Sequence, residues 1–196
     1  MRSICAAVTL PVLAAFSVAH SDGVIYETDF SQPPANWYYD QDWEFGNDGA
    51  VVQTDLHFWD ALMFSGGPGD QLIFFVPDGA DSIGIAIPYY LNASVDQGNV
   101  CFEIRFGCTD SGWETIWERS EYSGYVSETD TISYSPDYVQ GGDWVGINFE
   151  GFGECDTWGY MGVTWQIHGL TITAFGDSLS FESSTWAGIK AAGDSE

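Results

Sequence analysis

The stretch that decides the fold is NVCFEIRF, residues 99–106, in which apolar and polar side chains alternate. Successive side chains of an extended strand point to opposite faces, so Phe102, Ile104 and Phe106 share one face. The opposite face takes the residues between them: Cys101, Glu103 and Arg105. One face of this strand is therefore expected to lie in a core. The same one-sided pattern recurs in residues 83–87 and 145–149.

Alternation of this kind runs along most of the chain and is interrupted about every ten residues by turns rich in Gly, Pro, Asp and Asn. The predicted strands are residues 23–30, 43–45, 50–54, 57–64, 71–76, 82–90, 99–106, 114–119, 131–134, 144–149 and 162–175. Many short strands at this spacing predict an all-β fold, a jelly-roll sandwich of two antiparallel sheets packed face to face.

The chain opens with the features of a secretory leader. Arg2 gives a positive start, residues 4–16 are apolar apart from one threonine, and residues 17–19 form a small-residue cleavage site. We therefore predict a signal peptide at residues 1–19, a single β-sandwich domain at residues 20–177, and a tail at residues 178–196 that is a short helix or disordered. The apolar run is too short to span a bilayer, so the product is expected to be extracellular or periplasmic.

The charge balance excludes several classes of partner. There are 29 acidic and 4 basic residues, a formal net charge of −25. Such a surface repels nucleic acid and anionic lipid, and it favours a monomer at low salt. The chain also holds 9 Trp, 10 Tyr and 13 Phe, which supply a core and flat contact surfaces for uncharged ligands.

Three cysteines follow the leader, so in an oxidising compartment one of them is left over from any bridge. Cys101 and Cys108 lie too far apart to bond if the strand between them is extended. Cys108 and Cys155 both follow a predicted strand, in the settings FGC and FGEC, and we predict that they pair. The alternative is three buried thiols that act as small apolar groups.

The order of segments resembles secreted bacterial jelly-roll modules of the MAM, cleaved-adhesin and carbohydrate-binding type. A first strand ends in Glu27, Asp29 and Phe30, and a Pro-rich turn leads to Trp37. The segment CFEIRFGCTDSGWETIW looks like the family's strand, Asp, Gly and Trp segment, and DWVGINFEGFG and WQIHGLTITAF are similar to its last two strands. The resemblance covers roughly residues 24–175 and implies a concanavalin-like or galactose-binding-like sandwich that binds a glycan or a cell-surface partner.

The resemblance also implies a structural calcium between the first and last strands. It would place Glu27 or Asp29 near Asp177, and calcium binds carboxylate and carbonyl oxygens. Where these modules often have paired aspartates before the last strand, this chain has His168 and Gly169.

Aromatic residues near turns and acidic side chains are candidates for stacking on a sugar ring. The predicted contacts are Trp37, Tyr38, Tyr39, Trp43 and Trp59. The tryptophans in or beside later strands are instead predicted to fill the core: Trp113, Trp117, Trp144 and Trp165.

Two patterns leave an enzyme open as the alternative. In WYYDQDWEFGND, an extended chain puts Asp40, Asp42 and Glu44 on one face, and paired carboxylates on jelly-roll folds can hydrolyse glycosidic bonds. Cleavage after residue 19 would expose His20, whose amine and imidazole can bind copper if His57 or His168 adds a second imidazole, as in lytic polysaccharide monooxygenases.

No nucleophile elbow, phosphate loop, zinc spacing or dinucleotide fingerprint occurs in the sequence. The function that we predict is therefore a secreted, non-catalytic module that binds a glycan or a cell-surface partner, with calcium as its expected cofactor. The alternatives are a polysaccharide-active enzyme and a structural component of an extracellular layer.

Overall fold

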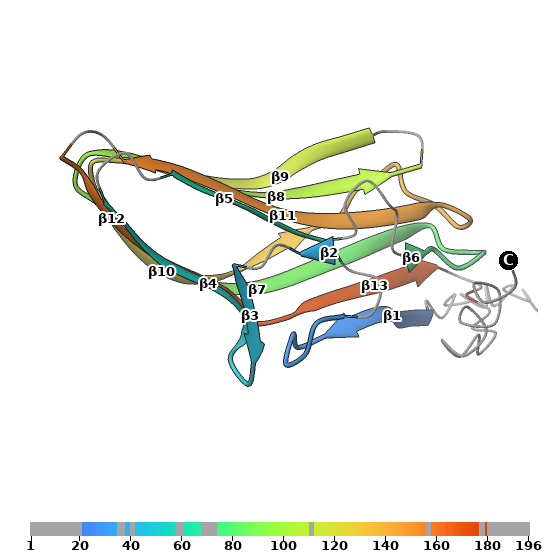
Figure 1. Cartoon of the computed structure of the whole chain (residues 1–196). Helices are drawn as coiled ribbons and strands as arrows, with labels where there is room; N and C mark the ends of the chain where they lie inside the picture. The colour runs from blue at the N-terminus through green and yellow to red at the C-terminus, as the bar shows by residue number, and fades with distance from the viewer. Residues whose placement is uncertain are drawn as a thin grey trace, which may run out of the picture.

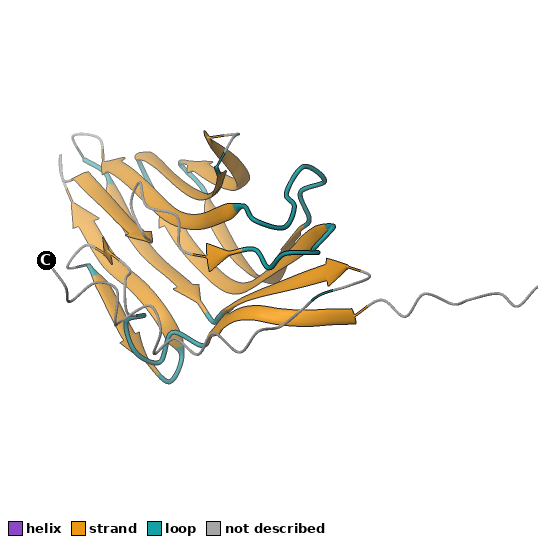
Figure 2. Cartoon of the chain, turned by 90° about the vertical axis from the view of Figure 1, so that its right-hand side faces the viewer, coloured by secondary structure: helices purple, strands orange, loops and turns teal. Residues whose placement is uncertain are grey.

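The computed structural model describes residues 21–34, 38–39, 42–57, 61–67, 74–109, 112–155, 158–176 and 179. Within these residues the chain forms strands and connecting turns, without a helix (Figure 2). The strands are β1 (Ser21–Thr28), β2 (Tyr38–Tyr39), β3 (Trp43–Gly46), β4 (Gly49–His57), β5 (Ala61–Gly67), β6 (Phe74–Phe75), β7 (Ser82–Val95), β8 (Gly98–Cys108), β9 (Gly112–Tyr122), β10 (Tyr125–Tyr134), β11 (Trp144–Cys155), β12 (Tyr160–Ile167) and β13 (Leu170–Gly176). In the part of the chain described here, nothing resembles a bilayer-spanning helix.

The strands build two antiparallel sheets that form the two layers of a sandwich (Figure 1). In the first, sheet A, β10 pairs with one edge of β7, and β12 and β13 follow each other along the other edge. Beyond them lie β4 and β3 on one side and β1 on the other. Sheet B has the order β2-β5-β11-β8-β9, with β6 paired to the start of β11. The predicted all-β jelly-roll sandwich is confirmed.

Alternation decides which side chains fill the space between the sheets. In β7 every second residue from Ile83 to Val95 is buried, and in β8 Phe102, Ile104 and Phe106 are fully buried, as predicted. Trp165 of β12 lies at the centre of the core and is fully buried. Four rings surround it at centroid distances of 5.4–6.1 Å: Trp43, Phe102, Trp117 and Phe149.

The strand predicted at residues 162–175 is two strands, because the chain changes partners in the middle. β12 pairs with β4, whereas β13 pairs with β1. At the junction the His168 N–H donates to the Pro88 carbonyl (2.9 Å), and a Cβ on Gly169 would lie 3.0 Å from the Thr28 carbonyl oxygen. The break therefore lies where the chain stops pairing with β4 and starts pairing with β1, within the same sheet.

The predicted disulfide between Cys108 and Cys155 is wrong. In the β8–β11 register Cys108 faces Val145, whereas Cys155 faces Gly98. The two cysteines therefore lie ten residues apart along the strand pair, about 33 Å at ~3.3 Å per residue, and bridged Cα atoms lie within ~7 Å. Cys101, Cys108 and Cys155 are buried thiols, which was the alternative interpretation.

Candidate functional site

The outer face of sheet B carries several exposed rings of the described chain, among them Phe75, Trp144 and Phe152. Val145, Ile147 and Phe149 of β11 point into the core, so the residues between them point outward. We call this surface the aromatic face; its residues are Met63 of β5, Phe75 of β6, Glu103 and Arg105 of β8, Trp113, Thr115 and Glu118 of β9, and Trp144, Asn148, Glu150 and Phe152 of β11.

Three rings gather at one end of the aromatic face. Phe75 and Trp144 are 49% and 44% exposed, and their centroids lie 5.3 Å apart at an interplanar angle of 70°. Trp113 covers Gly107 of the neighbouring strand, where a Cβ would lie 2.9 Å from the indole ring. The glycine lets the indole lie close against the sheet, which adds a third ring to this aromatic platform.

A second apolar pair lies at the other end of β11. Phe152 is 47% exposed and stands directly opposite Met63 of β5, which is 81% exposed. Eight residues separate Trp144 from Phe152, or about 27 Å of antiparallel strand at ~3.4 Å per residue. The two platforms therefore bracket a surface long enough for several units of a linear polymer.

Hydrogen-bonding side chains fill the space between the platforms. Arg105 Nη1 donates to Glu150 Oε1 (3.3 Å), and the Asn148 amide donates to the same oxygen. On the next strand pair, Thr115 Oγ1 donates to Glu103 Oε2 (3.3 Å). These contacts fix carboxylate, amide and guanidinium groups that can each accept from or donate to a ligand hydroxyl.

Three carboxylates cross this polar zone in a row. Glu103 stands opposite Glu150 on one side and opposite Glu118 on the other. Like charges in directly opposed positions destabilise a sheet by a few tenths of a kcal/mol to ~1 kcal/mol. Local arrangements that oppose stability are often found at functional sites, so the row makes the middle of the aromatic face a candidate site.

The aromatic contacts predicted from the sequence are mostly not the ones that the structure exposes. Trp43 is 7% exposed and packs on Phe149 and Trp165, so its prediction as a ligand contact is wrong. Trp144, predicted to be core, is exposed. Tyr38 and Tyr39 form β2 at the edge of sheet B, where only their backbone is described, and Trp37 and Trp59 lie outside the described residues.

The residues that sequence reasoning missed are those at the far end of β11. The strand was predicted to stop at Phe149, before Gly151 and Gly153. The strand in fact continues to Cys155, and the alternation that places Phe149 inside places Glu150 and Phe152 outside. Extending the period of two through the glycines would have found both.

The acidic trio does not form one carboxylate cluster in the described chain. Asp40 lies outside the described residues, and Asp42 lies in the turn before β3. Glu44 is exposed on β3, at the edge of sheet A, beside the buried Trp43. The alternation of Glu44 and Trp43 is confirmed, whereas the shared active site stays a prediction.

Glu27 and Asp29 line one hollow of about 580 Å³ with His168. The Ser31 N–H donates to Asp29 Oδ1 (2.9 Å), which lowers the pKa of that carboxyl. Asp177 lies outside the described residues. Among the described residues no group of three or more His, Cys, Asp or Glu side chains could hold a metal. The calcium set of Glu27, Asp29 and Asp177 stays a prediction that a titration can test.

Two of the three histidines of the copper hypothesis lie among the described residues of sheet A. His168 lies near Thr28, and its Nδ1 is 3.1 Å from the Asp48 carbonyl oxygen. His57 ends β4 beside Tyr160, at a ring distance of 5.0 Å. His20 lies outside the described residues, so the copper site stays a prediction.

No protein-family model matches the chain, and no curated protein matches it. Solved structures that it resembles include the xylan-binding module CBM15 (14% identity, TM-score 0.39, 79% of this chain and 97% of that one) and the N-terminal cellulose-binding domain of a Cellulomonas fimi β-1,4-glucanase (14%, 0.34, 73% and 92%). A xylan-binding domain from Paenibacillus barcinonensis is also similar (10%, 0.36, 80% and 97%). These are carbohydrate-binding modules, the class that the sequence resembles. Likenesses at this distance assign neither a family nor a ligand, so the function has to follow from the surface of the chain.

Proposed function

We propose that this chain is a secreted, non-catalytic module that binds a neutral polysaccharide along the aromatic face of sheet B. The observation that carries the proposal is the pair of exposed apolar platforms, Trp144 with Phe75 and Phe152 with Met63, at the two ends of one polar strand surface. Rings stack on the apolar faces of sugars, and the side chains between them bind hydroxyl groups. The signal peptide predicted at residues 1–19 supports export.

The charge of the site selects against acidic glycans. Arg105 is the single cation on the aromatic face, and its Nη1 already pairs with Glu150. The row of Glu103, Glu118 and Glu150 leaves a negative field in the middle of the face, and the net charge of −25 adds to it. Carboxylates accept hydrogen bonds from neutral sugars but repel uronic acids.

The test is affinity electrophoresis and calorimetry against hydroxyethylcellulose, arabinoxylan, galactomannan and polygalacturonate. We expect the protein to bind at least one neutral polymer and not polygalacturonate. Trp144→Ala with Phe152→Ala should weaken that binding by tenfold or more, about 1.4 kcal/mol, since anchoring rings carry most of the energy of such contacts.

The matched control removes another exposed ring that lies on neither platform. Tyr138 is 41% exposed and lies between β10 and β11, so Tyr138→Ala should leave the affinity as it is. Equal losses in the two proteins, or no binding to any polymer by the wild type, would overturn the proposal.

A second candidate function, hydrolysis of the bound glycan, is favoured by one observation. Glu103 and Glu150 lie on adjacent strands in directly opposed positions, which places two carboxylates side by side, and retaining glycosidases use a pair of neighbouring carboxyl groups. The two functions separate in one assay, since turnover releases reducing ends that Glu150→Gln abolishes. Binding without released sugar would reject the enzyme. If the protein showed neither binding nor turnover, the structural role would be the remaining candidate.

A further inference from the structure

The outer face of sheet A carries no charged side chain on four neighbouring strands. Its outward positions alternate with buried core residues, so their direction follows from the pleat. We call this surface the neutral face; its residues are Ser127, Thr129, Thr131 and Ser133 of β10, Gly84, Ala86, Pro88, Tyr90, Asn92 and Ser94 of β7, Tyr160, Gly162, Thr164 and Gln166 of β12, and Thr171, Thr173 and Phe175 of β13.

Composition does not explain this absence. The chain has 29 acidic residues, and charged side chains normally occupy outward positions of strands. β10 does the reverse, because its carboxylates Glu128 and Asp130 lie on the side that faces the other layer. There Glu128 accepts a hydrogen bond from the Tyr89 hydroxyl (2.9 Å) and lies 3.8 Å from Arg119. Inward charges protect an edge strand from pairing with other chains, but that role does not require the outward side to be free of charge.

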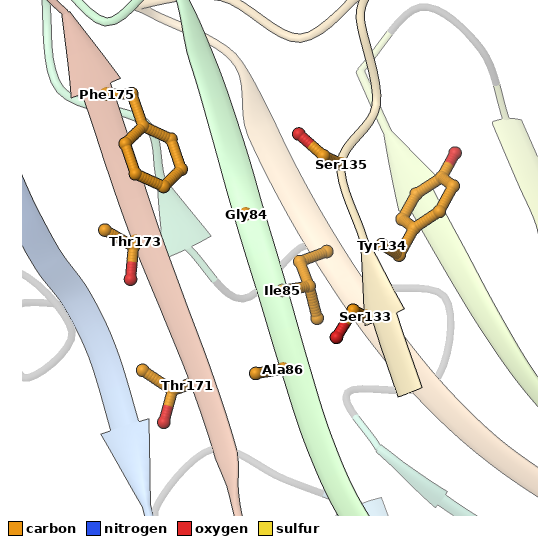
Figure 3. Close-up of a pocket in the computed structure, with 9 residues that line it drawn as sticks. All are labelled: Gly84, Ile85, Ala86, Ser133, Tyr134, Ser135, Thr171, Thr173 and Phe175. Atoms are coloured by element: carbon orange, nitrogen blue, oxygen red, sulfur yellow. The ribbon is translucent and has the colours of Figure 1, made fainter. Parts of the chain in front are cut away.

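A hollow of about 390 Å³ lies on the neutral face, between β13 and β10 (Figure 3). Its floor is Gly84 and Ala86 of β7, with Thr171, Thr173 and Phe175 on one side and Ser133 and Ser135 on the other. A Cβ on Gly84 would lie 2.9 Å from the Phe175 ring, so the ring rests on the bare backbone. The hollow therefore combines a ring, small floor residues and several hydroxyls.

The chemistry of the neutral face indicates its occupant. Ser135 Oγ donates to the Ile83 carbonyl (2.7 Å) and keeps its lone pairs for a donor, and each of the other hydroxyls can donate and accept. The four strands themselves offer a basic protein no charged partner, and the nearest carboxylates lie on the strands that flank them: Asp55 of β4, which accepts from the Tyr160 hydroxyl (3.0 Å), and Glu27 of β1, opposite Thr171. Two copies of a chain at −25 repel each other. A neutral, hydroxyl-rich polymer carries no such penalty, because it exchanges its hydrogen bonds to water for bonds of the same kind.

We propose that the neutral face is a second binding site for neutral polysaccharide, on the opposite layer of the sandwich from the aromatic face. This inference rests on the proposed function, because it assigns the same class of ligand to a second surface. One molecule then holds two polymer chains, one on each side, and acts as a cross-link between them.

The test measures how many oligosaccharides bind to each protein molecule and whether the protein cross-links the long polymer. It uses a neutral polymer of the panel that the wild type binds. The neutral-face variant is Thr173→Glu with Ser133→Glu, which puts charge beside the hollow, and its matched control is Thr173→Gln with Ser133→Gln. We expect about two oligosaccharides per wild-type protein and per control, about one for the Glu variant, and about one for Trp144→Ala with Phe152→Ala. Light scattering should rise when the wild type or the Gln control is added to the long polymer, because a protein with two sites cross-links it. It should not rise with the Glu variant or with the variant that carries Trp144→Ala and Phe152→Ala.

The outcomes separate the two sites. A stoichiometry of about one for the wild type, unchanged by the Glu variant, overturns the second site and leaves the aromatic face intact. Loss confined to the Glu variant supports the neutral face and overturns the proposed site instead. A wild-type dimer in sedimentation velocity that the Glu variant dissolves overturns the inference, because a second copy would then be the occupant of the neutral face.

Discussion

The two outer faces of the sandwich arrange their polar side chains in opposite ways. The aromatic face places rings at the ends of β11 and crowds three carboxylates between them, whereas the neutral face spreads hydroxyls and amides around a floor of Gly84 and Ala86. Both belong to one chain with a net charge of −25, so the charge is distributed by face and not evenly. The positions from which carboxylates are absent therefore say as much about the surface as the number of carboxylates does.

The largest effect should come from the core that both faces share. Trp165 is fully buried against four rings, and replacing a buried aromatic residue by alanine costs about 3–5 kcal/mol. Trp165→Ala should therefore lower the free energy of unfolding by that amount in a denaturant titration and weaken binding on both faces. Trp158→Ala removes a ring that is 74% exposed and should change stability by less than ~0.5 kcal/mol. Similar losses for the two variants would contradict this account of the core.

The faces can be separated by adding one methyl group to each. Gly107 lies under Trp113 on the aromatic face, and Gly84 lies under Phe175 on the neutral face, each with the ring 2.9 Å from a Cβ. Gly107→Ala and Gly84→Ala should each displace one ring and weaken binding on that face alone by about 1 kcal/mol, roughly fivefold. Calorimetry with an oligosaccharide reads both constants. If either substitution weakened both binding constants, the two faces would not be independent sites.

The sequence predicted the sandwich because its signal is local. Burial of one side of residues 99–106 and 145–149 follows from the pleat alone, and both predictions are confirmed. The aromatic face needed information that the sequence does not hold: which strands are neighbours, and where a strand continues through glycine. For this reason Trp43 was predicted to be a ligand contact and Trp144 to be core, whereas Trp43 is buried and Trp144 is exposed. The burial of each depends on the partner strands of β3 and β11 and not on its neighbours in sequence. The Cys108–Cys155 pairing failed likewise, since strand register sets that distance.

The contact between Tyr89 and Glu128, an inward carboxylate of β10, predicts that the fold loses stability at alkaline pH. Burial of Tyr89, with its hydrogen bond to Glu128, raises the pKa of Tyr89 to about 12 from a usual value of 10. The folded state then holds a proton that the unfolded state loses, so stability falls as the pH rises from 10 to about 12. Denaturant titrations across this range should show a shallower fall for Tyr89→Phe than for the wild type. Equal slopes would mean that this tyrosine is not linked to unfolding.

The smallest expected effect tests whether the carboxylate row on the aromatic face costs stability for the sake of function. Glu103→Gln removes the charge that faces both Glu118 and Glu150, and it should stabilise the fold by about 0.2–1 kcal/mol while weakening glycan binding. Glu154→Gln removes the same charge from the same sheet, but Glu154 faces Asn99 and Ala61, so its stability should not change. Thermal melting and calorimetry of the two proteins separate position from net charge. If both variants gain the same stability, relief of the overall charge explains the result; if only Glu103→Gln gains stability and it also loses affinity, the row is held against its own repulsion because the ligand uses it.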